Sequence, residues 1–280
     1  LEDYSFRTMS GAVKTGAQVD YNGAPAGYAS EPGEVISYVD AHDNETLWDS
    51  LTMKLPSSTS MDDRVRMNTV SLATTALAQT PSFWHAGADL LRSKSLDRNS
   101  YNSGDWFNTL DWTGSDNGFG KGLPPEADNA AKYGFMQPLL ADAKNKPSQE
   151  QVQQASSQAT DLLALRFSSK LFRLGSAEQI KAKVSYPVSG TTAMRQGVLV
   201  QRIDDTVGTD ADPALKGLVV VYNTTPHTQR QPVAGVKGAS FQLSPVQAKG
   251  SDDVVKKSSF DAASGTFTVP PRTVAVFVQK

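Results

Sequence analysis

The chain has 280 residues, of which 39% are hydrophobic and 20% charged, with a formal net charge of −2 and no cysteine. This composition is ordinary for a globular protein of about two domains. The small negative charge argues against a nucleic-acid partner, the lack of a long apolar run argues against a membrane span, and the absence of cysteine excludes disulfides and thiolate metal sites.

Residues 1–33 are rich in Gly, Ala, Ser and Asn and predict a surface loop. They resemble neither a signal peptide nor a transit segment. The sequence also lacks an initiator Met, so we expect it to begin inside a longer protein. Residues 35–39 are mainly β-branched and apolar, which predicts a strand buried on both faces, as in parallel sheets.

Two helices are predicted by capping residues followed by an apolar face. The first begins after Ser60, with Asp63 completing a capping box, and is stopped by Pro81. The second begins after Ser148, boxed by Gln151. The residues expected to face the core are Val65, Leu72, Ala73, Ala76 and Leu77 in the first helix and Val152, Ala155, Ala159 and Leu162 in the second.

A second short strand is expected at residues 82–86, before a long polar and aromatic loop that runs to about residue 130. Strand, helix, strand, helix is the pattern of an α/β unit. After about residue 170, short β-branched runs alternate with turn residues, which predicts an antiparallel β-sandwich. The sequence therefore predicts an α/β part at 1–170 and an all-β domain at 171–280.

The segment YVDAHDNETLWD, residues 38–49, places His42, Asp43 and Asn44 where the first strand ends. A simple polar turn is one interpretation. Ligands of parallel α/β folds, however, bind at the carboxyl ends of strands, and the second predicted strand also ends in a histidine, His85. These residues are therefore candidates for a ligand site.

The loop DLLRSKSLDRNSYNSGDWFNTLDW, residues 89–112, mixes charged, amide and aromatic side chains. Such a mixture suits a carbohydrate, because aromatic faces stack on sugar rings while polar groups bond hydroxyls. In the alternative interpretation, Trp106, Phe107 and Trp112 only anchor the loop to the core. We favour function, because loops of this length rarely lack one.

Other motifs carry little chemistry. The only histidines, His42, His85 and His227, lack the spacing of metal ligands, so we predict no metal site. The sequence contains no nucleophile elbow, P-loop or dinucleotide fingerprint. The acidic pairs at 204–205 and 252–253 are interpreted as solvated turns.

Four long motifs resemble those of type I pullulanases and limit dextrinases, the starch-debranching members of the α-amylase superfamily. They are YVDAHDNETLWD, FWHAGADLLRSKSLDRNSYNSGDWFNTLDW, GKGLPPEADN and LRFSSKLFRLGSAEQI. The resemblance runs from the first residues to about residue 185. It implies the C-terminal portion of a (β/α)8 barrel, with strands seven and eight and their helices, followed by an antiparallel β-sandwich. One departure is QTPSFWHAG, where the family usually has Gly-Ile-Pro before the aromatic pair.

By this resemblance, Asp43 corresponds to the carboxylate that stabilises the oxocarbenium-like transition state, and His42 to the histidine that bonds the sugar in subsite −1. A fixed carboxylate stabilises developing positive charge more than the neutral ground state. The further candidates for substrate binding are Asn44, Arg92, Arg98, Asn99, Tyr101, Asp105 and Asp128.

The resemblance also predicts a gap. Retaining glycosidases need a nucleophile and a separate acid/base carboxylate, which the family carries on strands four and five. Neither motif occurs in this sequence, so we expect the chain to lack both groups and to be inactive alone. We also expect residues 1–170 to need the upstream barrel segment as a partner.

The resemblance implies a secreted enzyme that cleaves α-1,6 linkages in pullulan, amylopectin and limit dextrins. It needs no organic cofactor, is compatible with structural calcium, and has no nucleic-acid or membrane partner. Two alternatives stay open: a non-catalytic glucan-binding or stability module, and an amylase-type relative that cuts α-1,4 bonds. The debranching-type loop at 92–108 argues against the second.

Overall fold

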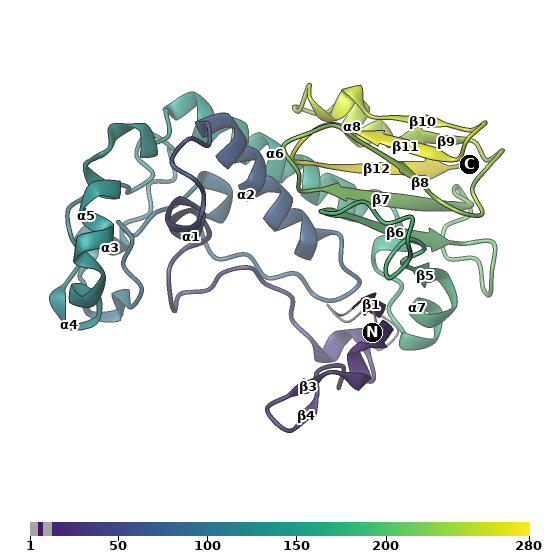
Figure 1. Ribbon diagram of the computed structural model, residues 1–280, viewed down its shortest axis with the longest axis horizontal. Coiled ribbons are helices and arrows are strands. Elements are labelled where there is room, and N and C mark those ends of the chain that lie inside the picture. Colours follow the sequence, from purple (N-terminus) through teal and green to yellow (C-terminus); the bar gives the residue numbers. More distant parts are fainter. Residues whose placement is uncertain (1–4, 8–12) are drawn as a thin grey trace. The chain divides into compact units, whose positions relative to one another are not determined.

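The computed structural model describes residues 5–7 and 13–280 (Figure 1). Predictions for residues 1–4 and 8–12 lie outside the described residues. The chain divides into two compact units. We call them the sandwich unit (1–37, 76–81 and 161–280) and the helical unit (38–75 and 82–160).

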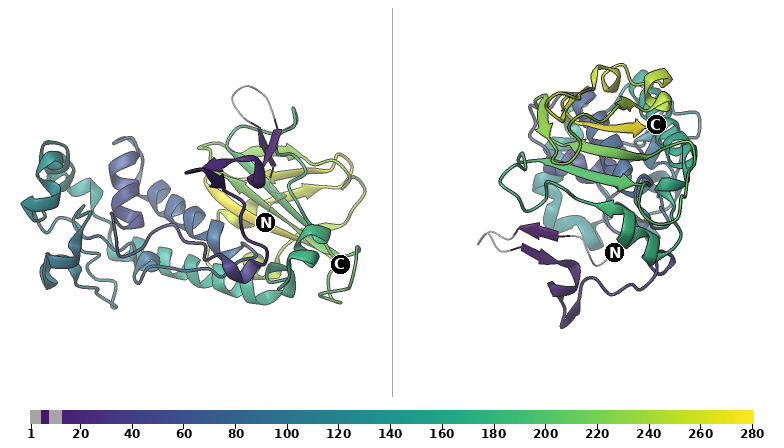
Figure 2. Two further views of the ribbon diagram at one scale, coloured as in Figure 1. Left: turned by 90° about the horizontal axis from the view of Figure 1, so that it is seen from below. Right: turned by 90° about the vertical axis from the view of Figure 1, so that its right-hand side faces the viewer.

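Two antiparallel sheets form the centre of the sandwich unit (Figure 2). The five-stranded sheet consists, in spatial order, of β5 (Val184–Ser185), β6 (Val198–Asp204), β7 (Gly217–Asn223), β12 (Thr273–Gln279) and β9 (Phe241–Leu243). The three-stranded sheet consists of β10 (Ser259–Asp261), β11 (Thr266–Val269) and β8 (Gln229–Pro232). The predicted antiparallel sandwich is confirmed.

The core of the sandwich is built from valine and phenylalanine side chains. Strand β7 is buried along its whole length, and it pairs with β12 in a register that sets Val220 opposite Val276. The rings of Phe267 and Phe277 lie 4.9 Å apart between centroids, and both side chains are fully buried. Burial of β-branched and aromatic residues on facing sheets is the main stabilising term of such a fold.

Short elements complete the sandwich unit. Two small hairpins pair β1 (Ser5–Arg7) with β2 (Val13–Thr15) and β3 (Asp20–Tyr21) with β4 (Ala24–Pro25). Helix α7 (Ala177–Lys183) precedes β5 in the sequence, and α8 (Pro245–Lys249) lies between β9 and β10. Across both units, single-turn 3₁₀ helices occur at Gly16–Gln18, Pro32–Glu34, Ala88–Leu90, Ser100–Asn102, Ala130–Lys132, Ala143–Asn145, Lys170–Phe172 and Val255–Lys257.

The helical unit is formed by α1 (Leu47–Lys54), α3 (Asp105–Asn108), α4 (Glu126–Asn129) and α5 (Tyr133–Ala141), and by most of α2 (Met61–Ala76) and α6 (Gln149–Ser168). Both predicted helix starts are confirmed. The Ser60 hydroxyl accepts a bond from the Asp63 N–H at 3.2 Å, and Ser148 and Gln151 bond each other's backbone N–H reciprocally. The predicted core faces are buried. Among the described residues, no helix has the length and apolar character that a membrane span requires.

The two predicted parallel strands are wrong. Residues 35–39 and 82–86 form no regular strand, and each segment contains only a single-residue bridge, at Ser37 and Ser82. Ile36 and Tyr38 are each 60% exposed. A parallel strand needs a parallel neighbour with which it forms a ladder of hydrogen bonds, and the sheets of the described residues are antiparallel. The chain is thus a mixed helix and sheet protein, and the barrel portion stays a prediction.

Candidate functional site

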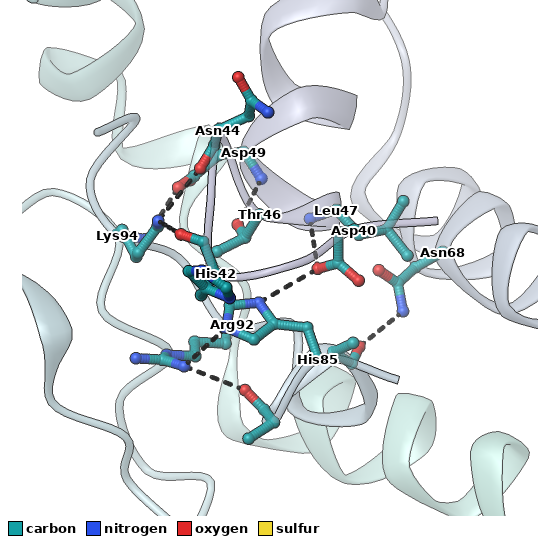
Figure 3. Close-up of polar contacts among 12 residues, drawn as sticks. Asp40, His42, Asn44, Thr46, Leu47, Asp49, Asn68, His85, Arg92 and Lys94 are labelled. Carbon is teal, nitrogen blue, oxygen red and sulfur yellow. Dashed lines mark hydrogen bonds and ion pairs between the residues drawn. The ribbon is translucent and has the colours of Figure 1, made fainter. Parts of the chain in front are cut away.

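The segment from His42 to Asn44 lies directly before helix α1, and the bonds at the start of the helix fix it (Figure 3). The Thr46 hydroxyl caps the helix by accepting the Asp49 N–H at 3.1 Å. The buried Asp40 carboxylate accepts the next free helix N–H, that of Leu47, at 2.9 Å. The chain between them turns sharply, with Asn44 in the left-handed region at φ 60°. Asparagine tolerates this conformation better than most residues, which explains its place here.

This turn presents His42 and Asp43 to solvent. Their side chains are 87% and 75% exposed, and His42 Nε2 lies 3.7 Å from Asp43 Oδ1. An ion pair of this exposure contributes little to stability. Both side chains are therefore free to bond a ligand.

Asp43 and Asn44 line an open pocket of about 450 Å³ together with Arg98, Asn99 and Asp128. Arg98 Nη2 donates to Asn44 Oδ1 at 3.4 Å, and Asn99 Nδ2 donates to Asp128 Oδ2 at 3.1 Å. Three segments that are far apart in the sequence thus bring five of the predicted site residues to one polar pocket. Such a lining offers donors and acceptors for hydroxyl groups.

A buried pair that the sequence did not single out holds this pocket together. Asp97 accepts bonds from the Asn99 N–H and from Asn129 Nδ2, both at 3.0 Å. The Asn129 side-chain oxygen in turn accepts the Arg98 N–H at 3.3 Å. Asp97 and Asn129 are fully buried, so the two loops that carry Arg98 and Asp128 are joined by a satisfied polar contact.

The other predicted residues lie elsewhere. Arg92 donates to the carbonyls of Ala86 and Asn108, at 3.2 and 2.6 Å, and its Nη1 lies 3.3 Å from His85 Nε2. His85 Nδ1 faces Asp40 Oδ2 at 3.5 Å, so Arg92 ends a chain of polar contacts beside the turn (Figure 3). Burial lowers the pKa of Arg92, opposed by the charges of Asp40 and Asp49.

Several exposed side chains of the long loop lie outside this pocket lining. Tyr101 is 84% exposed, and Asp105 is exposed at the first position of α3. Trp106 and Trp112 are 64% and 71% exposed, so the interpretation that they anchor the loop to the core is wrong for these two residues. Phe107 is partly buried.

Behind the turn lies a second buried network. Asp49 accepts bonds from the Ser93 hydroxyl at 2.5 Å and the Lys94 N–H at 2.8 Å. The Lys94 ammonium donates to the carbonyls of His42 and Asn44, at 3.0 and 3.1 Å (Figure 3). Burial raises the pKa of Asp49 to about 6, although these bonds act in the opposite direction, and it lowers the pKa of Lys94.

The described residues contain no group of three or more His, Asp or Glu side chains that could hold a metal ion. The acidic turn at Asp111 does not offer free ligand oxygens either, because protein donors already bond its carboxylate. Its carboxylate accepts bonds from Thr113, Ser115 and the Asp116 N–H, and these bonds hold its pKa well below the usual range. Asp111 is therefore a turn residue with its oxygens in use.

Comparison with known proteins places this geometry in a family context. Residues 114–280 match the family model described as alpha-1,6-glucosidases, pullulanase-type, C-terminal. Pullulanase 1, chloroplastic, of Arabidopsis thaliana is 41% identical over 285 residues, covering 100% of this chain and 29% of the relative. The pullulanase of Klebsiella pneumoniae is 37% identical, covering 99% of this chain and 25% of the relative. This chain thus spans under a third of either relative.

Solved structures agree. The crystal structure of Klebsiella pneumoniae pullulanase complexed with maltotriose superposes with a TM-score of 0.90 at 38% identity. It covers 100% of this chain and 26% of that structure. The pullulanase PulA from Klebsiella oxytoca gives a TM-score of 0.90 at 37% identity. This chain therefore shares both its fold and more than a third of its residues with these pullulanases over its whole length.

Proposed function

This chain belongs to the pullulanase-type alpha-1,6-glucosidases, and on that basis we propose that it forms part of the active site of a starch-debranching enzyme. The observation that carries the proposal is the polar pocket beside Asp43, where five residues from three segments converge. The proposed substrates are pullulan, amylopectin and limit dextrins, cleaved at α-1,6 linkages. The maltotriose held by the Klebsiella pneumoniae pullulanase supports an α-glucan ligand.

In this proposal, Asp43 is the transition-state stabiliser. Hydrolysis passes through an oxocarbenium-like state, and a carboxylate held near the developing positive charge lowers its free energy more than that of the ground state. His42 bonds the sugar at the same subsite. The residues proposed to contact other glucose units are Asn44, Arg92, Arg98, Asn99, Tyr101, Asp105 and Asp128, of which Asn44, Arg98, Asn99 and Asp128 line the pocket.

The nucleophile and the acid/base carboxylate are proposed to come from an upstream barrel segment of the same enzyme. A retaining mechanism needs both carboxylates on either side of the scissile bond. We propose that residues 1–170 complete a (β/α)8 barrel with that segment, with the sandwich domain at 171–280. Asp43 is exposed in this chain, whereas a carboxylate acts strongly on a transition state only where water is excluded. In this proposal the upstream segment covers Asp43 and excludes that water.

Secretion and structural calcium are parts of the proposal that rest on the family. One relative is a chloroplast protein and others are bacterial, so location varies within the family. A calcium requirement would appear as loss of thermal stability after chelation. No organic cofactor is needed for this chemistry.

Asp43→Asn in the complete enzyme tests the central claim. Because the amide removes the charge and keeps the shape, we expect kcat on pullulan to fall by about 100-fold or more. The matched control is Asp253→Asn, at an exposed sandwich carboxylate that pairs with Lys256. The control should keep full turnover, and unchanged circular dichroism should show that both variants fold.

A non-catalytic role is the alternative, favoured by the separate compactness of the sandwich unit. In that case Asp43→Asn would leave turnover unchanged. Analysis of the pullulan products separates the remaining option. Maltotriose indicates α-1,6 cleavage, whereas panose or isopanose indicates an amylase-type enzyme that cuts α-1,4 bonds.

A further inference from the structure

Lys94 is a buried lysine with an unusual set of partners. Its side chain is 1% exposed, although lysine is almost never fully buried unless its charge is compensated. Its ammonium donates to two backbone carbonyls, those of His42 and Asn44. These residues immediately precede and follow Asp43. The Lys94 side chain is therefore hydrogen-bonded to the backbone on both sides of the proposed transition-state stabiliser (Figure 3).

The other end of Lys94 is fixed as well. Its backbone N–H donates to Asp49, and the Asp49 N–H donates to the Thr46 hydroxyl at the start of α1. Lys94 therefore joins the first turn of the helix to the loop that precedes the helix. Asp49 and Ser93 are also fully buried, so this connection is shielded from water and its bonds are strong.

The turn needs such a connection. Asn44 is held at φ 60°, a left-handed conformation that asparagine tolerates better than most residues but that still lies outside the preferred regions for a residue with a Cβ atom. The Asp43 side chain itself projects into solvent and is 75% exposed, so its own packing does little to hold it in place. The position of its carboxylate is therefore set by the backbone of residues 42–44, and Lys94 holds that backbone.

We propose that Lys94 is a positioning residue for Asp43. It keeps the His42 and Asn44 carbonyls turned inward, and in doing so it keeps the Asp43 carboxylate turned outward at the pocket. The Lys94 ammonium is attracted by the carboxylates of Asp97, Asp49 and Asp43 and repelled by the guanidinium of Arg92. This proposal rests on the proposed function, since it requires Asp43 to act on the bound glucan.

The test is a double-mutant cycle in the complete enzyme, with pullulan as substrate. Lys94→Met keeps the length and apolar stem but removes the donors. We expect kcat to fall by about 10- to 100-fold, because displacement of a reacting group by about 1 Å costs that much. KM should change by less than about threefold, because Asp43 acts mainly in the transition state.

The second half of the cycle places Lys94→Met in the Asp43→Asn background. If Lys94 acts through Asp43, the substitution should then lower kcat by less than about threefold, since coupled residues are not additive. Lys94→Arg keeps the charge and the donors and should recover part of the lost turnover. Lys144→Met, at an exposed lysine, is the control and should behave as the wild type.

Two results would overturn the proposal. One is an unchanged kcat for Lys94→Met, and the other is an equal loss in both backgrounds, which a general structural role predicts. Full turnover of Asp43→Asn alone would instead overturn the proposed function, so the two failures are distinct. Should Lys94→Met fail to give a cooperative thermal transition, Lys94→Arg enters the same cycle, and its larger head group is expected to lower kcat only where Asp43 is present.

Discussion

Burial gives two nearby carboxylates opposite properties. Asp43 is 75% exposed beside the pocket, whereas Asp49, six residues on, has no exposed surface. Asp49 accepts bonds from Ser93 and Lys94, yet desolvation dominates and raises its pKa to about 6. One carboxylate is thus available to a ligand, and the other is a buried structural group that titrates in mildly acidic solution.

Asp49 should therefore make stability depend on pH in an unusual direction. Its pKa is 3.8 when unfolded and about 6 when folded, so between these values the folded state binds more protons. The contribution of this group to the free energy of unfolding then falls as pH rises from 3.8 to about 6, and is constant above that. Paired carboxylates such as Glu45, whose pKa is lowered, change stability in the opposite direction.

A difference measurement isolates Asp49 from the other groups. We expect the stability of the wild type relative to Asp49→Asn, measured by urea unfolding, to be greatest near pH 4 and to fall toward pH 6. Asp253→Asn, at an exposed carboxylate whose pKa is lowered by its bond with Lys256, should show the opposite trend. A wild-type advantage that grows from pH 4 to pH 6 would contradict the assignment.

The sequence identified the exposed residues of the site better than the buried ones. His42, Asp43, Arg98 and Asp128 are recognisable because they stand in long polar motifs. Lys94 and Asp97 stand in the same motifs, but nothing in their spacing shows that they turn inward. Their roles depend on partners far along the chain, such as Asn129 for Asp97, and only the folded backbone reveals these pairs.

At the scale of elements, helix α2 ends in an unusual way. Helices commonly end at a glycine in the left-handed conformation. Helix α2 ends at Ala76, and the residues that follow it are Leu77 and Ala78 rather than glycine. The guanidinium of Arg166, on α6, donates instead to the carbonyls of Ala76, Ala78 and Thr80, each at 2.8 Å. One buried side chain thus satisfies the free carbonyl of the last helix residue and two carbonyls of the segment that follows the helix.

Removing these donors should be costly. Arg166→Met is expected to lower the free energy of unfolding by at least about 2 kcal/mol, because buried carbonyls lose their partners. In a chain of this size that corresponds to a fall in Tm of roughly 4 °C or more. Differential scanning calorimetry checks this, with Arg230→Met, at an exposed position of strand β8, as control. Equal melting of the two variants would show that water replaces the guanidinium without loss.

Elements were predictable where local sequence decides them. The Ser60 and Ser148 caps and the sandwich strands carry their own signals: a hydroxyl before an apolar face, or β-branched runs between turns. The strands expected at 35–39 and 82–86 carry the same apolar signal but lack neighbours to pair with. Composition therefore indicates a tendency to form a strand, but a strand forms only where a neighbouring strand is available to pair with it.

At the scale of the whole molecule, two exposed aromatic side chains of the helical unit mark a surface that another part of the protein could cover. Tyr38 is 60% exposed and Phe83 is 48% exposed, their ring centroids lie 6.4 Å apart, and both residues lie in segments that the sequence predicts to be strands. Large exposed apolar side chains close together mark surfaces that bind another part of a protein. Under the proposed function, that part is the upstream barrel segment, whose strands would supply the absent hydrogen bonds.

Amide hydrogen exchange distinguishes this view from an intrinsically extended segment. We expect peptides that cover 35–39 and 82–86 to exchange within seconds in the 280-residue chain, because few of their N–H groups have partners. In the complete enzyme the same peptides should be protected by about 1,000-fold or more, as in a buried sheet. Strands β7 and β12 are the internal control and should be protected in both. Equal exchange of 35–39 in the two proteins would mean that no barrel strand forms there, and the placement of Asp43 at a strand end would fall with it.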